Sequence, residues 1–416
     1  MDILVVGGGG RESAIVASLK KNPSVGRVWC APGNGGIVDS VPINVMDFDG
    51  LTAFAKEKQV GFVVVGPDDP LAAGLVDRLE EAGFPCFGPD AKAAVIEASK
   101  AFSKALMKEY GIPTASYEVF SDVKEALGYI ERCRLPIVIK ADGLALGKGV
   151  VIAYTRTEAC RAVTEAMVGM KFGKSGEKLV IEEFLTGPEV SVLSFTDGNV
   201  VVPMVSSMDH KRAYDGDEGP NTGGMGAVAP NPFYTDEVAA QCMERIFLPT
   251  IRAMKAIGRP FKGCLYFGLM LTPLGPKVIE YNCRFGDPEA EVVLPLLESD
   301  LLTIMRHVHD GTLSDGDVRF RKDSACCVVL ASGGYPLAYK KGKRITIGTA
   351  DAAIFHAGTA LESDVLVTNG GRVLDVVATA PTLREAVDKA YKATHAITFE
   401  GMYMRNDIGR RALSGE

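Results

Sequence analysis

The pattern of apolar and polar positions divides the chain into regions of different character. Near the N-terminus, short strand-like runs at 2–6, 27–31, 61–65 and 85–88 each lead into glycine or proline, and helical patterns lie between them. Alternation of this kind predicts a parallel sheet with helices on both faces. Ligands bind in the loops that follow the strands of such a sheet. The first region is therefore a candidate substrate domain.

The next region begins with a helical pattern at 93–110, and strands and helices at 116–195 predict a small α+β lobe. At its centre, 137–153 reads IVIKADGLALGKGVVIA, in which two β-branched runs flank a loop with glycines and a lysine. Glycine lets a backbone approach an anion closely, and lysine adds a mobile positive charge. The loop is a candidate cover for phosphates, although it lacks the P-loop spacing. An ordinary glycine hairpin is the alternative.

The last part of the chain opens with a long polar segment at 206–232, whose composition favours a functional loop over a disordered linker. A helical pattern and two strands follow, and the second strand ends in VIEYNCRFGDPE. Glu280 and Asn282 are two apart on that strand, so both side chains project to one face. One carboxylate and one amide oxygen suit Mg²⁺, and Arg284 lies beside them to neutralise a transferring phosphoryl group. A solvated strand end is the alternative.

Composition excludes several functions. The chain has 416 residues and a net charge of −7, without a basic tail or a block of like charge. A role on nucleic acid or at a membrane surface therefore lacks its electrostatic basis. Nine cysteines are scattered without a C-x-x-C pair, and the N-terminus lacks the features of a signal peptide. We expect a cytoplasmic, multidomain protein that binds small molecules, with no nucleic-acid or membrane partner.

The order of the chemical motifs resembles the ATP-grasp superfamily: Lys104, IVIKADG with Lys140, GKG, IEEFL and then IEYN. Further motifs resemble the phosphoribosylamine–glycine ligase family, also called the glycinamide ribonucleotide synthetases, over essentially the whole chain. These motifs are GGGGRES (7–13), SMDHKR (207–212), GPNTGGMGA (219–227), NCRFGDPE (282–289) and VTNGGRVL (367–374).

This resemblance implies an α/β and α+β multidomain fold. An N-terminal parallel-sheet (pre-ATP-grasp) domain is expected at 1–100, and an ATP-grasp core of two α+β lobes at 101–324. The small lobe would cover about 116–195, and a small β-rich C-terminal domain would cover 325–416.

The resemblance also implies the chemistry. The enzyme would use ATP and Mg²⁺ or Mn²⁺ to join glycine to 5-phosphoribosylamine through glycyl phosphate, in de novo purine biosynthesis, as a monomer or small homo-oligomer. ATP would contact Lys104, Lys140, Gly143, Gly147, Lys148, Gly149, Glu182, Glu183, Phe184, Leu185 and Glu189. Glu280 and Asn282 would bind the metal, and Arg284, Asp287 and Lys140 would act at the reacting groups. The sugar-phosphate and glycine pocket would include Gly9, Gly10, Arg11, Asn34, Gly66, Pro67, Asp209, His210, Lys211, Asn221, Thr222, Gly223, Gly224, Pro288 and Glu289.

Two departures from the family pattern stand out. Position 13 is Ser, where the glycine-loop motif of the family usually has His, so we expect altered affinity rather than lost function. The strand before E-x-N, CLYFGLML, is apolar and lacks a further acidic metal ligand. Metal binding would then depend more strongly on ATP.

Three other interpretations stay open. A nicotinamide-dependent oxidoreductase rests only on VVGGGG, and its G-x-G-x-x-G fingerprint would need glycine at position 12, which is Glu. Another ATP-grasp carboxylate–amine ligase would act on a different amino acid. A catalytically inactive nucleotide-binding protein would keep the fold without turnover. Turnover of ATP with defined amino acids separates these alternatives.

Overall fold

The N-terminal region forms a parallel sheet, as its sequence pattern predicts. The computed structural model describes residues 1–144 and 149–415. The strands β1 (Ile3–Gly7), β2 (Val28–Pro32), β3 (Phe62–Val65) and β4 (Cys86–Phe87) pair in the order β2-β1-β3-β4, all parallel. The connecting helices are α1 (Gly10–Leu19), α2 (Phe48–Glu57), α3 (Asp68–Ala72), α4 (Leu75–Glu81) and α5 (Ala91–Ala98).

Strand β1 is buried on both faces, which explains its uninterrupted apolar run. Ile3 and Val5 belong to one core cluster, whereas Leu4 and Val6 belong to another. Both clusters also contain residues from the middle of the chain, and the first extends to the C-terminal sheet. The N-terminal domain is therefore packed firmly against the rest of the molecule.

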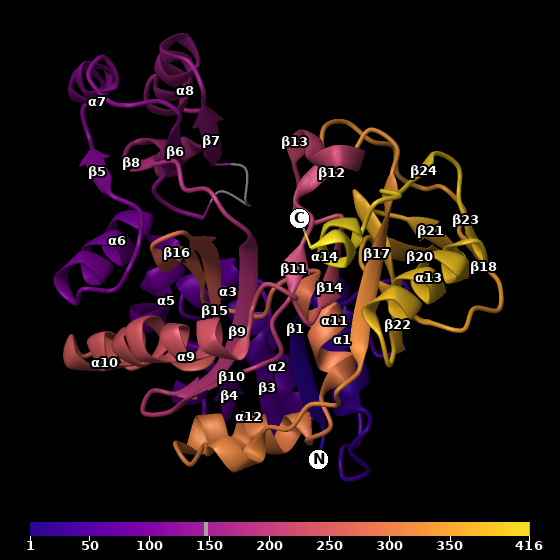
Figure 1. Ribbon diagram of the computed structural model, residues 1–416. Coiled ribbons are helices and arrows are strands. Elements are labelled where there is room, and N and C mark those ends of the chain that lie inside the picture. The colour runs from indigo at the N-terminus through magenta and orange to yellow at the C-terminus, as the bar shows by residue number, and fades with distance from the viewer. Residues whose placement is uncertain (145–148, 416) are drawn as a thin grey trace.

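The small lobe has a sheet and a core of its own (Figure 1, upper left). Its strands β5 (Tyr117–Phe120), β6 (Ile137–Ala141), β7 (Val150–Ala153) and β8 (Leu179–Glu183) pair antiparallel in the order β5-β8-β6-β7. Its helices are α7 (Val123–Ile130) and α8 (Arg156–Met167). The helical pattern at 93–110 is interrupted at Ser99, which ends α5 and caps α6 (Lys100–Glu109).

One strand that we expected within the small lobe pairs elsewhere. Strand β9 (Glu189–Asp197) lies between β10 (Val201–Pro203) and β15 (Lys262–Thr272), and β16 (Gly275–Asn282) completes this second antiparallel sheet. The sheet is accompanied by α9 (Asp236–Cys242), a π-helical turn (Met243–Phe247), α10 (Leu248–Ala256), α11 (Glu289–Val293) and α12 (Leu301–Asp310). The sheet of the small lobe thus ends at Glu183.

The C-terminal sheet includes two strands from the polar segment 206–232, which we expected to be a loop. Its order is β11 (Met208–Asp209), β14 (Gly226–Ala229), β17 (Ser324–Ser332), β22 (Arg372–Ala380) and β19 (Ala353–His356), and β24 (Met402–Tyr403) also pairs with β17. The C-terminal module is therefore not built from residues after 324 alone. Around it lie β12 (Arg212–Tyr214), β13 (Glu218–Asn221), β18 (Thr346–Ile347), β20 (Thr359–Glu362), β21 (Val365–Thr368), β23 (Ile397–Thr398), α13 (Leu383–Thr394) and α14 (Arg410–Ser414).

Figure 1 shows the small lobe standing apart from the C-terminal sheet, with β16 below the small lobe and β11 and β14 on the side of that sheet nearer to it. The motifs that the sequence singles out therefore come together near the centre of the molecule. Within the described ranges, no helix has both the length and the apolar character needed to cross a bilayer.

Candidate active site

Two buried lysines converge on one carboxylate between the small lobe and the rest of the chain. Lys104 of α6 and Lys140 of β6 are 2% and 3% exposed, and their ammonium nitrogens lie 3.0 and 3.1 Å from the oxygens of Glu182. Lys140 and Glu182 project from one face because β6 and β8 pair antiparallel in that register. Burial lowers the pKa of Lys104 to about 8, although the charge of Glu182 opposes this shift. Two cations thus share one anion here.

The predicted metal ligands lie at the end of β16, next to this group. Lys140 donates to the carbonyl of Ile279 at 3.0 Å, which brings Glu280 beside the lysines. Burial raises the pKa of Glu280, but the charges of nearby lysines and Arg284 outweigh it and lower the pKa. Within the described residues, the Glu280 carboxylate has no ion pair of 4.0 Å or less. An ionised carboxylate in a positive field is available to a divalent cation.

The amide of Asn282 and the guanidinium of Arg284 lie beyond Glu280. Arg284 donates to Oδ1 of Asn282 at 3.2 Å and pairs with Glu97 of α5 at 3.3 Å. Glu97 also accepts the N–H of Cys283 at 2.7 Å, so it fixes the start of this motif. No group of three or more metal-ligating His, Cys, Asp or Glu side chains occurs in the described part of the chain. The donor set fits a hard cation that takes its other ligands from phosphates and water.

Asp287 is the point at which three domains meet. Its Oδ2 accepts the backbone N–H of Arg11 at 3.4 Å, and its Oδ1 lies 2.8 Å from Arg372 of β22. Burial opposes ionisation of Asp287, but the charges of Arg372 and Arg11 outweigh it and lower its pKa. A Cβ on Gly9 would lie 3.1 Å from Oδ2 of Asp287, so the first glycine loop packs directly against this carboxylate.

The segment with Asp209 and Lys211 lines the other side of the same region. Lys211 pairs with Glu189 at 3.1 Å and contributes to the field that keeps Glu280 ionised. Burial, and secondly the charge of Glu289, raise the pKa of Asp209 well above its usual value. Gly224 of the second glycine-rich loop packs so closely that a Cβ there would lie 2.7 Å from Oδ1 of Asp209. The loop at Asn221–Gly224 therefore touches both Asp209 and Pro288.

The N-terminal glycine loop uses several of its donors internally. Oε2 of Glu12 accepts the N–H groups of Gly8 and Gly9 at 3.2 and 2.7 Å, and the Nε of Arg11 lies 2.5 Å from its Oε1. The backbone of Gly66 also packs against Glu12, next to Pro67. A sugar phosphate at this loop would have to compete with a carboxylate of the protein, so the residues predicted here gain no direct support.

The neighbouring loop, which contains Asn34, is hydrogen-bonded to the C-terminal domain. Asn34 donates to the hydroxyl of Ser13 at 3.1 Å and to the carbonyl of His356 at 2.8 Å, and Ser13 donates to the same carbonyl at 2.5 Å. The hydroxyl of Ser13 therefore joins two domains.

Some predicted residues lie apart from this region or outside the described residues. Glu183 points to the opposite face from Glu182 and pairs with Lys277 at 3.0 Å. Both ring nitrogens of buried His210 are bonded: Nδ1 donates to the Gly226 carbonyl at 3.3 Å, and Nε2 accepts the N–H of Gly409 at 3.2 Å. The predicted phosphate contacts Gly147 and Lys148 fall within 145–148, outside the described residues.

The remaining predicted ATP contacts flank the described ends of the loop and the end of β8. The carbonyl of Gly143 accepts Lys100 at 2.8 Å, and the carbonyl of Gly149 accepts the N–H of Ala141 at 2.8 Å. Phe184 and the adjacent Leu185 are half-buried. Lys100 is a cation that our sequence interpretation did not assign, although it lies four residues before Lys104 on α6.

Sequence reasoning also missed Glu12, Glu97 and Arg372. Glu12 and Arg372 lie inside quoted motifs, GGGGRES and VTNGGRVL, so a signal was present in each case. No such sequence signal marks Glu97, because nothing in its helix distinguishes it from an exposed glutamate.

Comparisons with known proteins found related sequences over the whole chain. The sequence matches three domain profiles of phosphoribosylglycinamide synthetase: the N domain at 1–97, the ATP-grasp (A) domain at 98–290 and the C domain at 325–411. A phosphoribosylamine–glycine ligase of Halalkalibacterium halodurans is 48% identical over 100% of this chain and 98% of its own length. A trifunctional purine biosynthetic protein of Gallus gallus is 47% identical over 99% of this chain and 42% of its own length.

Solved structures show the same likeness. The crystal structure of a phosphoribosylamine–glycine ligase from Thermotoga maritima superimposes with a TM-score of 0.87 at 36% identity, over 98% of this chain and 100% of that chain. A biotin carboxylase domain from Hydrogenobacter thermophilus gives a TM-score of 0.74 at 19% identity, over 97% of this chain and 91% of that chain, which shows the fold alone.

Proposed function

The chain belongs to the phosphoribosylglycinamide synthetase family, and we propose that it joins glycine to 5-phosphoribosylamine with cleavage of ATP to ADP and phosphate. The product is glycinamide ribonucleotide, in de novo purine biosynthesis. The observation that carries the proposal is the meeting of three elements in one region. Buried lysines suit phosphates, Glu280, which has no ion pair among the described residues, suits a divalent cation, and segments of three domains converge on Asp287.

The ATP half of the site is proposed between the small lobe and β16. Lys104 and Lys140 would exchange part of their contact with Glu182 for phosphate oxygens, a charge-assisted interaction of the same kind. The glycine loop after Ala141 would cover the phosphates. Because the small lobe has its own hydrophobic core, it can approach or leave the nucleotide as one body.

Glu280 and Asn282 would hold Mg²⁺ or Mn²⁺ through oxygen atoms. A bound divalent cation neutralises charge on the phosphate oxygens during phosphoryl transfer. Arg284 stands next to both ligands and is held in place by Glu97, so its charge is fixed before the reaction begins.

The half of the site that would bind glycine and phosphoribosylamine, called the acceptor half, is proposed around Asp209, Lys211, the loop Asn221–Gly224 and Asp287. The carboxylate of glycine attacks the γ-phosphate, and the amine of phosphoribosylamine then displaces phosphate from glycyl phosphate. Neither step needs a covalent nucleophile of the protein, so catalysis rests on positioning, charge neutralisation and exclusion of water. Lys211 is placed to balance carboxylate charge, since it already pairs with Glu189 and faces Glu280.

The proposal is tested by measuring ADP release from ATP with Mg²⁺ and glycine, with and without freshly generated phosphoribosylamine. We expect ADP formation to require both substrates and to yield glycinamide ribonucleotide. Alanine and serine in place of glycine serve as matched controls. Turnover with one of these amino acids and none with glycine would keep the fold and refute the proposed substrate.

A further inference from the structure

The backbone N–H and carbonyl of Gly223, within GPNTGGMGA, are both hydrogen-bonded to side chains of the C-terminal domain. Its N–H donates to the hydroxyl of Tyr335 at 3.1 Å, and its carbonyl accepts Nη1 of Arg372 at 3.1 Å. Tyr335 and Arg372 lie more than 100 residues away in sequence. The conformation of this loop is therefore set from outside the segment that contains it.

The same guanidinium also holds the motif GDPE. Nη1 of Arg372 lies 2.8 Å from Oδ1 of Asp287 and donates to its backbone carbonyl at 2.9 Å. Both side chains are largely buried, with exposures of 21% and 14%. A buried, charge-assisted pair of this kind fixes both orientation and ionisation state. One side chain thus sets the distance between Gly223 and Asp287.

Steric fit limits what this arrangement tolerates. A Cβ on Gly223 would lie 2.9 Å from Cζ of Arg372, and a Cβ on Gly224 would strike Pro288, next to Asp287. The glycine-rich loop is thus pressed between Arg372 and the GDPE motif. Movement of the guanidinium would release the loop and the carboxylate together.

We propose that Arg372 is a positioning residue of the ligase reaction, which aligns Asp287 and the Asn221–Gly224 loop around glycine and phosphoribosylamine, and that Tyr335 supports it at Gly223. The inference rests on the proposed function and extends it, because it assigns part of the acceptor pocket to the C-terminal domain. The ATP half of the site has no contact with either side chain among the described residues. Loss of Arg372 should therefore affect the two acceptor substrates selectively.

The kinetic test compares Arg372→Met, Arg372→Lys and Tyr335→Phe with the wild type. We expect Arg372→Met to lower kcat/KM for glycine and phosphoribosylamine about 10²-fold, as misplacement of reacting groups by about 1 Å does, while KM for ATP stays unchanged. Arg372→Lys should recover part of the loss, and Tyr335→Phe should give a smaller loss of the same pattern. Tyr339→Phe is the matched control: its ring lies 6.1 Å from that of Tyr335, and its hydroxyl makes no hydrogen bond within the described part of the chain.

A second readout needs no turnover. Hydrogen exchange of peptides spanning 219–227 should accelerate in Arg372→Met and Tyr335→Phe and stay at the wild-type rate in Tyr339→Phe. Unchanged exchange, or a KM for ATP that rises together with the loss of kcat/KM for glycine, would overturn the positioning role. Failure of the wild type itself to form ADP from the two substrates would refute the proposed function instead, and the exchange data would still report on the anchoring of the loop.

Discussion

Lys104 lies 3.0 Å from Glu182, and each of these side chains is at most 4% exposed. Lys140 shares the same carboxylate at 3.1 Å, so one carboxylate pairs with two ammonium groups. Buried charges of this kind need a partner, and a nucleotide phosphate would supply one. Burial, and secondly the charge of Lys140, lower the pKa of Lys104 to about 8 from 10.5, although the charge of Glu182 opposes this shift.

The first prediction concerns proton uptake on ATP binding. A bound phosphate favours the charged ammonium and raises the pKa of Lys104, so ATP binding at about pH 8 to 9 should take up protons. Affinity for ATP should fall as pH rises above about 8, because the free protein then has lost this proton. Calorimetry in two buffers of different ionisation enthalpy measures the uptake. In Lys104→Arg, whose guanidinium does not titrate, the uptake should disappear; equal uptake in both proteins would contradict the assignment.

The second prediction concerns the carboxylate of Glu280. Glu280→Gln keeps the shape of the side chain but removes the charge, so kcat should fall about 10²–10³-fold, as when a single charge-stabilising group is lost. Folding should change little, because the side chain is half-buried at a strand end and no ion pair within the described residues is broken. Steady-state rates across a Mg²⁺ titration and a thermal melt measure both effects. Lys277→Gln, which removes a charge from the same strand, is the control, and a wild-type rate in Glu280→Gln would refute the metal assignment.

Much of the fold followed from hydrophobic periodicity, but tertiary contacts decided the exceptions. Serine is not a strong helix breaker, so the sequence at 93–110 predicted an unbroken helix. Ser99 nevertheless ends α5 because Asp142, from the small lobe, accepts the Ser99 hydroxyl at 3.1 Å and the N–H of Ala101 at 3.0 Å. No local pattern reveals a partner more than 40 residues away.

The candidate site, like the fold, was predictable where local sequence patterns decide and not where distant contacts do. Motifs predicted roles for the lysines and Glu280, because the chemistry of phosphate and metal binding restricts the residue types. Alternation along β8 already indicates that Glu182 and Glu183 face opposite sides, so only one of them can join the lysines. The partner of Asp287 was not predictable in this way, since Arg372 reaches it from another domain across 85 positions.

The third prediction concerns Asp375, a buried carboxyl near Asp287 and Glu291. Burial and the charge of Asp287 raise its pKa to about 8 from 3.8. Between these values the folded protein keeps a proton that the unfolded chain has lost, so this group lowers the free energy of unfolding as pH rises. Asp375→Asn cannot ionise, and its stability relative to the wild type should therefore increase from pH 5 to pH 8. Urea denaturation at both pH values measures the difference; parallel pH dependence in the two proteins would contradict it.

The fourth prediction concerns Ser13. Its hydroxyl bonds to Asn34 and to the carbonyl of His356, so it joins the N-terminal and C-terminal domains. Ser13→Ala should lower the free energy of unfolding by about 1 kcal/mol, the usual net value of one hydrogen bond. The KM for phosphoribosylamine should change less than about twofold. An increase well beyond that, with unchanged stability, would show that the hydroxyl contacts the substrate.

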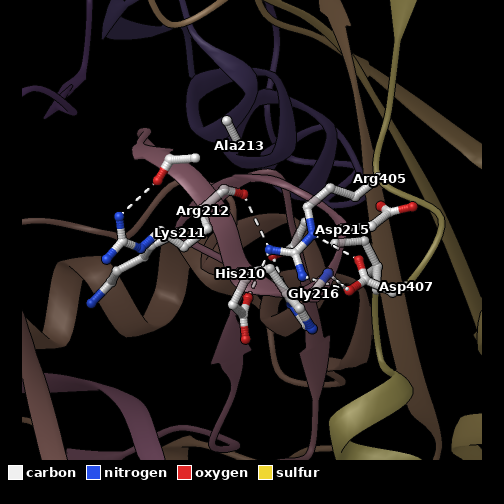
Figure 2. A network of polar contacts seen from close by, with 12 residues as sticks. His210, Lys211, Arg212, Ala213, Asp215, Gly216, Arg405 and Asp407 are labelled. Atoms are coloured by element: carbon white, nitrogen blue, oxygen red, sulfur yellow. Dashed lines mark hydrogen bonds and ion pairs between the residues drawn. The ribbon is translucent and has the colours of Figure 1, made fainter.

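The last prediction concerns the C-terminal segment at 402–409, which fastens the hairpin that follows Lys211 (Figure 2). Arg405 is 1% exposed and bonds to Asp407, to Asp217 and to the carbonyl of Arg212. Arg405→Met removes a buried partner and leaves Asp407, which is 14% exposed, without its guanidinium. We expect a loss of about 3–5 kcal/mol in the free energy of unfolding, since breaking a buried pair strands the remaining charge.

Asp217→Asn is the matched control for Arg405→Met, because it breaks the other ion pair of the same guanidinium. Asp217 is 54% exposed, so its loss should cost at most about 1 kcal/mol. Chemical denaturation of both variants measures the contrast. Because Gly409 and His210 are bonded next to this pair, Arg405→Met should also loosen the Asp209–Lys211 segment and raise the KM for glycine. Equal stability losses in the two variants would show that the buried pair with Asp407 does not dominate the anchoring.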